Sequence, residues 1–429
     1  MAKRLLRIFG PLILAAILVL AVLVSPVTFG FKKVSAGEER QAAVSLSPNV
    51  LKGKRIKEAA LKQNYVPFFG SSEWSRIDPM HPSVLAQKYH RDYRPFLLGA
   101  RGTQSLTQFF VMQNIQSELK NKKAVFVISP QWFVKDGTRK DAFAFYYSQL
   151  QTTEWLSHYR HDAIDQYAAK RLLQMPVAKS DHFLYAALKR VSAGQSLTSN
   201  QRFYLKAKQN MLTQEDEFFS GINMPSQNLN KVNQQAKKLP TQYSFSKLDA
   251  LAGRIGKSQT GNNRFQISDS FYNHGLKQEL KGGKLAGFQK NLSYTKSPEF
   301  ADFQLVLDQF ARLHTNVMFI IPPVNAKWSA YTGLSQSMLR QFDQKIRYQL
   351  QSQGFNNICD LTDKSNVPYF MTDTIHLGWR GWLAVDQKVD PFLTQPQAKP
   401  KYTINDKFYS QEWQQLNPNE LTTYADTTN

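Results

Sequence analysis

The segment Tyr65-Val66-Pro67-Phe68-Phe69-Gly70-Ser71-Ser72-Glu73 joins a short apolar run to a turn that contains a glycine and two serines. A continuous apolar run of this length predicts a buried strand, and Gly-Ser-Ser predicts a tight turn at its end. Much later in the chain comes Asp373-Thr374-Ile375-His376. A serine in a turn after a buried strand, with a late aspartate and histidine, provides the groups that serine acyl transfer needs.

Each half of this pair also has a purely structural explanation. Gly-Ser-Ser is common in turns, because glycine tolerates positive φ and serine hydroxyls bond to nearby backbone. An Asp-x-x-His segment is often a helix start, with the aspartate as N-cap. The sequence contains no Gly-x-Ser-x-Gly motif, so the arrangement differs from the nucleophile elbow of the α/β-hydrolases. The two halves together favour an acyl-transfer site.

Four apolar runs of strand length predict a parallel sheet, and helical patterns separate several of them. The runs are Val66–Phe69, Phe96–Leu98, Ala124–Ile128 and Val317–Ile321, and the clearest helical patterns are Thr103–Lys120 and Glu299–Leu313. Short buried strands that alternate with helices are typical of an α/β fold, in which helices cover both faces of a parallel sheet. We therefore expect a three-layer α/β/α fold, with the loops after the strands gathered at one edge of the sheet.

The N-terminal region predicts a membrane anchor over residues 8–30. Ile8 to Phe31 contains no charged side chain, and 20 helical residues span about 30 Å, the thickness of the hydrocarbon core of a bilayer. A cleaved signal peptide ending near Val34-Ser35-Ala36 is the alternative, but the apolar run is longer than a typical signal core. The basic residues Lys3, Arg4 and Arg7 favour a cytoplasmic N-terminus at 1–7 and an extracellular remainder, anchored to the cell membrane by a single pass.

The rest of the chain divides into a juxtamembrane segment at 31–62, a catalytic domain at 63–395 and a polar tail at 396–429. Within the catalytic domain, residues 141–299 are predicted to form an insertion that caps the active edge of the sheet, or else decorates the domain without contacting substrate. We expect long surface loops over 221–291. Four helices are expected before them, over Asp141–His158, Ala163–Gln174, Asp181–Val191 and Asn200–Glu215.

The charge balance predicts a polyanionic partner. The net charge is +22, and the first 33 residues hold five basic and no acidic side chains, so the remainder carries +17. Such an excess attracts anionic polymers or lipids. For a domain outside the cell we expect anionic lipid or a cell-wall polymer rather than nucleic acid. The single cysteine, Cys359, excludes an intramolecular disulfide.

An acyl-transfer site also needs donors that stabilise a tetrahedral oxyanion. The candidates are the backbone N–H of Ser72, a glycine N–H in the Gly99–Gly102 loop and the side-chain amide of Gln131. Arg101 could instead neutralise a substrate phosphate or carboxylate. No histidine cluster has the further ligands that a metal site needs, so we expect no metal.

Several segments together resemble the DltD family, membrane-anchored proteins of the D-alanylation pathway of Gram-positive teichoic acids. The family belongs to the SGNH/GDSL hydrolase-like superfamily, so the resemblance implies that fold. The segments that carry it are the N-terminal anchor, Phe68–Glu73, Gly99–Leu106, Ile128–Phe133, Pro322–Asn325 and Asp373–Trp379.

The superfamily pattern assigns roles to individual positions. Its first block, Gly-Asp-Ser, falls on Gly70-Ser71-Ser72, which implies that Ser72 is the nucleophile. Ser71 replaces the usual aspartate and is an oxyanion or substrate-binding candidate. The last block falls on Asp373 and His376. The glycine of the second block corresponds to Gly102, with Gly99 as the alternative. The third-block asparagine is absent, and Gln131 occupies the comparable loop.

The resemblance implies D-alanyl transfer onto teichoic acid through a Ser72 acyl-enzyme, without a cofactor. The implied partners are teichoic acid, the membrane-bound O-acyltransferase of the pathway and the D-alanyl carrier protein. Two alternatives remain: a D-alanyl esterase or thioesterase, in which water replaces the polymer hydroxyl, and a non-catalytic scaffold that binds the polymer and the membrane partner.

Overall fold

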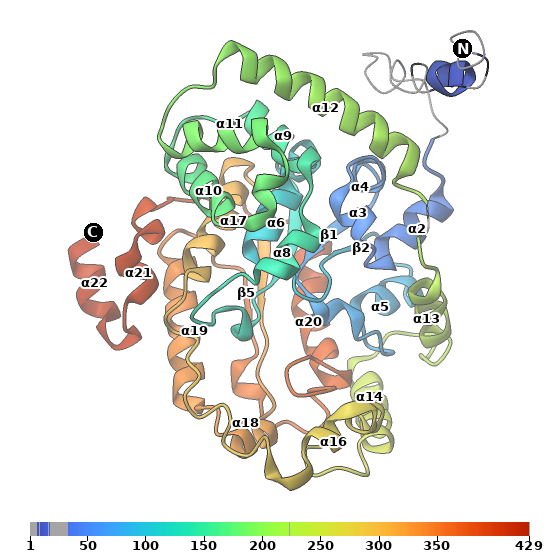
Figure 1. The fold of residues 1–429 in the computed structure, drawn as a ribbon. Helices are drawn as coiled ribbons and strands as arrows, with labels where there is room; N and C mark the ends of the chain where they lie inside the picture. The colour runs from blue at the N-terminus through green and yellow to red at the C-terminus, as the bar shows by residue number, and fades with distance from the viewer. Residues whose placement is uncertain (1–6, 8, 16, 18–32, 223, 429) are drawn as a thin grey trace.

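A five-stranded parallel sheet forms the centre of the molecule, with the strand order β2-β1-β3-β4-β5. The structure is a computed structural model that describes residues 7, 9–15, 17, 33–222 and 224–428 (Figure 1). The strands are β1 (Tyr65–Phe69), β2 (Arg94–Leu98), β3 (Lys123–Val127), β4 (Asn316–Ile321) and β5 (Ile358–Asp360). The four predicted strands and their parallel arrangement are confirmed, whereas β5 was not predicted.

Helices cover both faces of the sheet. Successive strand residues point to opposite sides, so each strand contributes side chains to two apolar clusters. Phe69 and Phe126 belong to one buried apolar cluster, with α6 (Ser105–Gln113) and α17 (Glu299–Arg312). Phe68 and Val125 belong to a second cluster, with α5 (Pro82–Lys88) and α20 (Trp379–Thr394). Cys359 of β5 lies in the second cluster and is 2% exposed. The fold is therefore α/β with helical layers on both faces of the sheet.

The described part of the chain forms further α-helices around this core. In chain order they are α2 (Ala36–Ser45), α3 (Pro48–Lys52), α4 (Arg55–Leu61), α7 (Gln116–Leu119), α8 (Lys140–Tyr146), α9 (Gln149–Ser157), α10 (Ala163–Leu173), α11 (His182–Ser192), α12 (Ser199–Phe219), α13 (Gln227–Ala236), α14 (Phe245–Gln259), α15 (Asp269–Phe271), α16 (Lys277–Glu279), α18 (Ala326–Thr332), α19 (Gln336–Gln351), α21 (Gln411–Gln415) and α22 (Leu421–Thr428). Short 3₁₀ helices, η1 (Ser72–Ser75) and η2 (Pro130–Trp132), follow β1 and β3.

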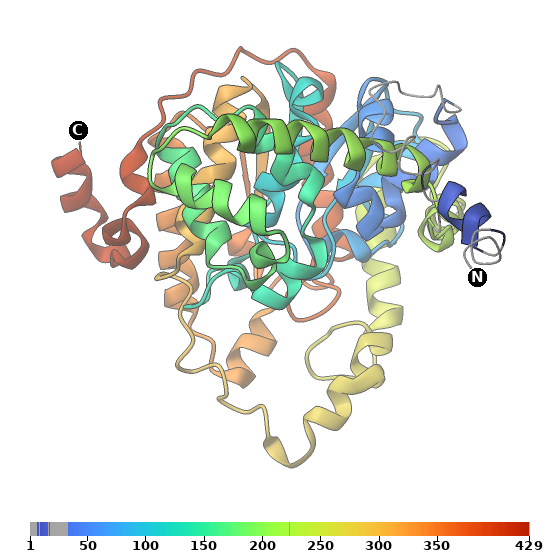
Figure 2. The same ribbon diagram turned by 45° about the horizontal axis from the view of Figure 1, so that its top comes forward.

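The stretch 141–299 consists of two parts that lie at opposite ends of the molecule (Figures 1 and 2). Apolar residues of α9, α10 and α11 join the cluster formed with α6 and α17, so this part thickens one helical layer. The part around α14 and α16 lies at the other end, and Ser268 donates a backbone hydrogen bond to Thr372 near the predicted histidine. A portion of this stretch therefore contacts the loop that carries Asp373 and His376, and its capping role stays a prediction.

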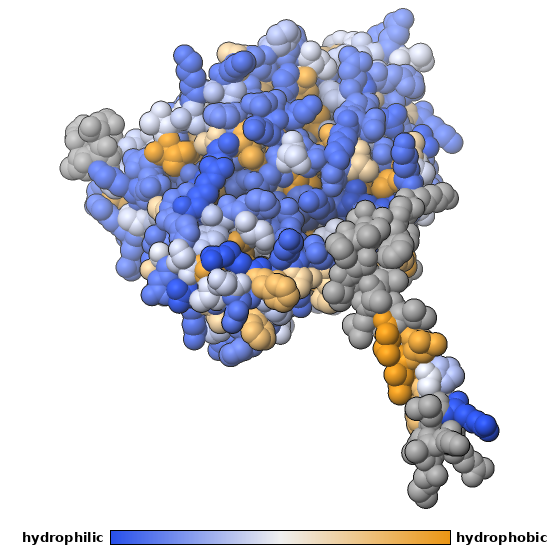
Figure 3. Space-filling model, turned by 90° about the horizontal axis from the view of Figure 1, so that it is seen from above, coloured by the Kyte–Doolittle hydropathy of each residue, from blue (hydrophilic) through white to orange (hydrophobic). Residues whose placement is uncertain are grey.

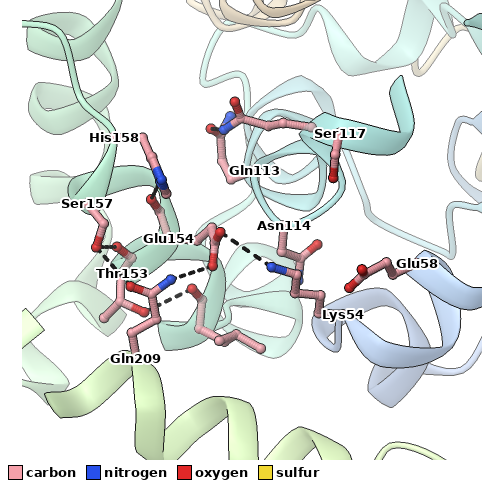
Figure 4. Close-up of polar contacts among 12 residues, drawn as sticks. Lys54, Glu58, Gln113, Asn114, Ser117, Thr153, Glu154, Ser157, His158 and Gln209 are labelled. Carbon is pink, nitrogen blue, oxygen red and sulfur yellow. Dashed lines mark hydrogen bonds and ion pairs between the residues drawn. The ribbon is translucent and has the colours of Figure 1, made fainter. Parts of the chain in front are cut away.

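Polar contacts attach α12 to the first part of this stretch (Figure 4). Glu154 of α9 accepts a hydrogen bond of 2.6 Å from Gln209 of α12 and lies 3.5 Å from the ammonium of Lys54, just before α4. Ser157 donates a second hydrogen bond to Gln209, at 3.0 Å. These contacts connect three helices that are distant in the sequence.

The prediction of long surface loops over 221–291 was wrong. Helices α13 and α14 occupy much of this range, and each buries a narrow apolar stripe: Val232 and Ala236 on α13, and Leu248 and Ala252 on α14. These residues join the second apolar cluster. Most other positions of the two helices are polar, which gives the sequence its loop-like composition.

The C-terminal segment is folded as well. Phe408 and Trp413 are fully buried and pack against α17 and α19, and Tyr409 donates a hydrogen bond of 2.5 Å to Asp308. The tail is polar in composition, but it contributes to the larger apolar cluster.

The predicted anchor at 8–30 falls largely outside the described residues. Within the part of the chain that the structure does describe, no helix combines the length and the apolar character needed to cross a bilayer. Seen from above, the surface is mainly hydrophilic, with scattered hydrophobic side chains (Figure 3).

Candidate active site

The turn after β1 places Ser72 at the carboxyl edge of the sheet. Gly70 is necessary here, because a Cβ atom would lie 2.6 Å from Nε1 of Trp74. The loop after β2 approaches just as closely, since a Cβ on Gly99 would lie 2.4 Å from the carbonyl of Gly70. Ser72 then begins η1, with its side chain partly accessible. Two glycines thus let two loops pack tightly enough to present the serine.

The structure brings together the three residues predicted to form the triad. Ser72 Oγ lies 2.8 Å from Nε2 of His376. Nδ1 of His376 lies 2.9 and 2.8 Å from the two carboxylate oxygens of Asp373. This order, hydroxyl to Nε2 and Nδ1 to carboxylate, is the one in which an imidazole can remove a serine proton while a carboxylate orients it.

The loop that carries Asp373 and His376 is held by its own backbone. Met371 and Leu377 form an isolated antiparallel bridge, and the N–H of Thr372 donates to the carbonyl of His376 at 2.9 Å. Oδ1 of Asp373 accepts the N–H groups of Ile375 and His376 at 3.0 and 2.9 Å. The helix-start role considered for this aspartate is wrong, because the next helix, α20, begins at Trp379 with Gly378 as its N-cap. The carboxylate of Asp373 instead holds the turn that leads to His376.

Asp373 is 1% exposed, and its charge is balanced by cationic and hydrogen-bonding groups. Burial alone would raise the pKa of this carboxyl, but His376 and the guanidinium of Arg76 outweigh burial and lower the pKa below its usual value. Nε of Arg76 lies 2.9 Å from Oδ2 of Asp373. A carboxylate held ionised in this way can stabilise an imidazolium.

Sequence reasoning missed Arg76. It lies four residues after Ser72, next to η1, and its side chain is about one-third exposed. The only signal in the sequence was a basic residue shortly after the serine turn. Its pairing with Asp373 could not be predicted, because it requires contact between two segments about 300 positions apart.

Ser71 and Glu73 stabilise the turn. Ser71 is 3% exposed, and its hydroxyl donates to the carbonyl of Ala100 at 3.1 Å. The N–H of Ser71 donates to Glu73 at 2.7 Å, and the same buried carboxylate accepts the hydroxyl of Ser129 from the loop after β3. Both polar groups of Ser71 are used within the protein, which favours a positioning role over the predicted substrate contact.

The second loop presents Gly102 and Arg101. Gly102 has a φ of +91°, and a Cβ would lie 2.8 Å from the Cβ of Ala142 in α8. Arg101 is exposed, and its carbonyl accepts a hydrogen bond from Tyr146 at 3.2 Å. Glycine is therefore required at position 102 by conformation, and the oxyanion and substrate roles of this loop stay predictions.

Gln131 lies in η2, in the loop after β3. Its Oε1 atom is buried and accepts no hydrogen bond from the part of the chain described. An oxyanion contact would need the amide N–H groups of Gln131 and not Oε1, so this role stays a prediction.

The comparison with known proteins identifies the family. The sequence pattern of the family described as "DltD protein" matches residues 43–394. The chain is 49% identical to Protein DltD of Lacticaseibacillus rhamnosus over 422 residues, which cover 98% of both chains. It is 34% identical to Protein DltD of Bacillus subtilis (strain 168), over 90% of this chain and 97% of that one. The chain belongs to the DltD family.

In this DltD family member, two further residues that were not predicted hold the serine loop. Thr103 donates to the carbonyl of Gly70 at 2.8 Å, and Gln108 of α6 donates to the same carbonyl at 2.5 Å. Gln108 also donates to the carbonyl of Leu98 at 2.9 Å. Both side chains are fully buried, so the ends of β1 and β2 are tied to α6 directly behind the site. Within the described residues, no three His, Cys, Asp or Glu side chains are grouped to hold a metal ion.

Proposed function

We propose that this protein is a serine acyltransferase that moves D-alanine onto teichoic acid at the outer face of a Gram-positive cell membrane. The DltD family takes part in D-alanylation of teichoic acids, and this chain is a member of it. The observation that carries the proposal is the 2.8 Å contact between Ser72 and His376, with Asp373 on the other ring nitrogen.

In the first half-reaction, Nε2 of His376 removes the proton of Ser72 while Oγ attacks the D-alanyl carbonyl of an activated donor. The tetrahedral intermediate collapses to an ester on Ser72, and the imidazolium returns its proton to the leaving group. In the second half-reaction, His376 deprotonates a hydroxyl of the polyol phosphate chain, which attacks the ester. Ser72 then leaves with a proton from the imidazolium. Asp373 remains ionised and stabilises the imidazolium in both steps.

The oxyanion of each intermediate requires hydrogen-bond donors. We assign this role to the backbone N–H groups of Ser72 and Gly102 and to the amide of Gln131. The serine after the first strand and the Asp-x-x-His segment late in the chain support an SGNH-like arrangement of these loops.

The position of the site in the cell follows from the sequence. Residues 8–30 would anchor the chain with residues 1–7 in the cytoplasm, and the +17 charge of the remainder would attract the anionic polymer. The pathway's membrane-bound O-acyltransferase and, through it, the D-alanyl carrier protein would deliver the acyl group.

The test is to trap the acyl group on the full chain and to map the modified residue by mass spectrometry. We expect a D-alanyl ester on Ser72, and none in the Ser72→Ala variant. Label on Ser71 would overturn the choice of nucleophile. If Ser72→Ala retains folding, partner binding and D-alanine incorporation, the protein is a scaffold. If the acyl group passes to water and not to added polymer, the protein is an esterase.

A further inference from the structure

A cavity of about 420 Å³ lies directly beside Asp373. Four segments form it: the loop that follows η1, helix α13, residues 259–274 and the loop that carries Asp373. The lining residues that matter here are Arg76, Asp78, Lys231, Gln235, Ser268 and Ser270. The cavity therefore shares a wall with the proposed catalytic site, but neither Ser72 nor His376 lines it.

Two cationic side chains line the cavity, and their charged groups are not fully used. Nε of Arg76 pairs with Asp373, and the guanidinium lies 5.6 Å from the ring centre of Phe271. The two Nη groups of Arg76 donate no hydrogen bond to the residues that the structure describes. Lys231 makes no ion pair with any of the same residues. Burial lowers the pKa of its ammonium, and the carboxylate of Asp78 opposes that effect. A planar guanidinium and an ammonium are well suited to bind a phosphate.

The acidic groups in the cavity do not cancel this charge. Asp373 is already paired with His376 and Arg76. Burial raises the pKa of Asp78 to about 7, against the opposing effects of backbone N–H groups and Lys231. Near neutral pH this carboxyl is therefore partly protonated. Its Oδ2 atom is buried with no hydrogen-bond partner among the described residues.

Neutral polar groups complete the lining. Oε1 of Gln235 is buried and likewise has no partner in the described part of the chain. Ser268 and Ser270 also line the cavity, and the hydroxyl of Ser270 lies 3.5 Å from Nδ1 of His274. Amide, carboxyl and hydroxyl groups around a cationic pair offer both donors and acceptors, which suits a ligand that carries alcohol groups beside an anion.

We infer that this cavity is a subsite for one glycerol or ribitol phosphodiester of the acceptor chain, next to the unit whose hydroxyl reaches Ser72. The inference rests on the proposed function, because it takes the acceptor to be a polyol phosphate. Arg76 and Lys231 bind the phosphate, and the amide and hydroxyl groups bind the polyol. Since Arg76 also contacts Asp373, the bound phosphodiester is held at the edge of the catalytic site.

The test measures binding of glycerophosphoglycerol to the full chain in detergent, by isothermal titration calorimetry in the Ser72→Ala background. We expect binding that weakens as salt is added, because ion pairs with phosphate are screened. Lys231→Gln should weaken it about five- to tenfold, and Lys231→Arg should largely restore it. The control is Lys237→Gln on the same segment, because Lys237 is exposed and does not line the cavity.

Every outcome decides the inference. Equal binding by Lys231→Gln and Lys237→Gln, or equal losses in both, would overturn it. If inorganic phosphate binds as tightly as glycerophosphoglycerol, the cavity is a general anion site and the inference is wrong. If free glycerol alone competes with glycerophosphoglycerol, the phosphate does not contribute to binding, and the inference is again wrong. If Lys231→Gln loses binding to phosphatidylglycerol vesicles and not to glycerophosphoglycerol, the cation faces lipid. Labelling of Ser72 by a fluorophosphonate tests the proposed function separately, and the control variant Lys237→Gln should be labelled at the wild-type rate.

Discussion

Asp373 and Glu299 are both almost completely inaccessible to solvent, yet their surroundings favour opposite protonation states. Asp373 is 1% exposed, and Glu299, at the start of α17, is 0% exposed. The pKa of Asp373 is lowered, because His376 and Arg76 outweigh the effect of burial. The pKa of Glu299 is raised to about 8 by burial and by the neighbouring carboxylate of Asp302. A buried carboxyl thus stays ionised here only where cationic partners face it.

The difference separates the proposed catalytic region from a structural one. Glu299 accepts hydrogen bonds from the backbone of Ser105 at 2.8 Å and from Thr138 at 3.1 Å, so it joins α17 to the start of α6. The nearby cation, Arg171, is paired with Asp302. Asp373 is instead positioned to stabilise charge on His376. The predictions below test this division, from the largest expected effect to the smallest.

Replacing His376 with glutamine should have the largest effect. Without the imidazole no base contacts Ser72, and the rate of fluorophosphonate labelling of Ser72 should fall by a factor of about 10³–10⁴. Labelling is measured on the purified full chain, with Ser72→Ala as the blank. Labelling within tenfold of wild type would show that the serine is activated by another group.

Removing Asp302 should strongly destabilise the structural region. Asp302→Ala leaves the guanidinium of Arg171, which is 8% exposed, buried without its carboxylate. We expect a loss of about 3–5 kcal/mol in the free energy of unfolding, as measured by urea denaturation. The control is Asp141→Ala, which breaks the exposed pair with Arg139 and should leave the denaturation midpoint unchanged. If Asp302→Ala and Asp141→Ala have similar denaturation midpoints, the buried pair contributes no more to stability than the exposed pair.

Asp373→Asn should lower the labelling rate of Ser72 by about 10²–10³-fold while the protein stays folded. The amide keeps the shape of the carboxylate but cannot stabilise an imidazolium by charge. The circular dichroism spectrum and melting temperature serve as controls for folding. An unchanged labelling rate would show that the charge of Asp373 does not contribute to the activation of Ser72.

Glu299→Gln should change the pH dependence of stability. The folded-state pKa of Glu299, about 8, lies above its usual 4.5, so between these values the folded state binds more protons than the unfolded state. Glu299 therefore contributes stability at low pH that is lost as the pH rises toward 8, by at most about 1.4 kcal/mol per pH unit. The variant should flatten this slope in urea denaturation between pH 5 and about 8. An unchanged slope would mean that Glu299 is ionised in the folded protein.

Arg76→Gln should give the smallest effect, because its pair with Asp373 is partly exposed to solvent. We expect a two- to fivefold fall in labelling of Ser72, in the range of about 1 kcal/mol or less. Without the guanidinium the pKa of Asp373 rises, so the acid limb of the labelling rate should move to higher pH. Arg76→Lys should recover part of the shift. A pH profile identical to wild type would show that His376 alone keeps Asp373 ionised.

The sequence was informative where local signals were strong. Continuous apolar runs predicted β1 through β4, and the Gly-Ser-Ser turn and Asp-x-x-His segment predicted residues that the structure brings into contact. Strand β5 has only three residues, which is too short for a periodic pattern to show. Helices α13 and α14 were missed because each buries few residues on a polar background.

The partners of the site could not be predicted for a different reason. Arg76, Thr103 and Gln108 are polar residues with ordinary local patterns, and their roles come from contacts made across the fold. Gln108, for example, is recognisable only once its amide is seen at the carbonyl of Gly70, at the end of another strand. A single sequence shows which polar groups are present, but the contacts between them are determined by tertiary packing.

The lone thiol of the chain has a practical consequence. Cys359 is almost completely inaccessible, and burial raises its pKa to about 12, so it should not react with maleimide reagents in the native protein. A Ser270→Cys substitution would introduce an exposed thiol at the rim of the cavity beside Asp373. A fluorophore attached there would carry no background from the natural cysteine, and a change in its emission on addition of polymer would test the proposed subsite in real time.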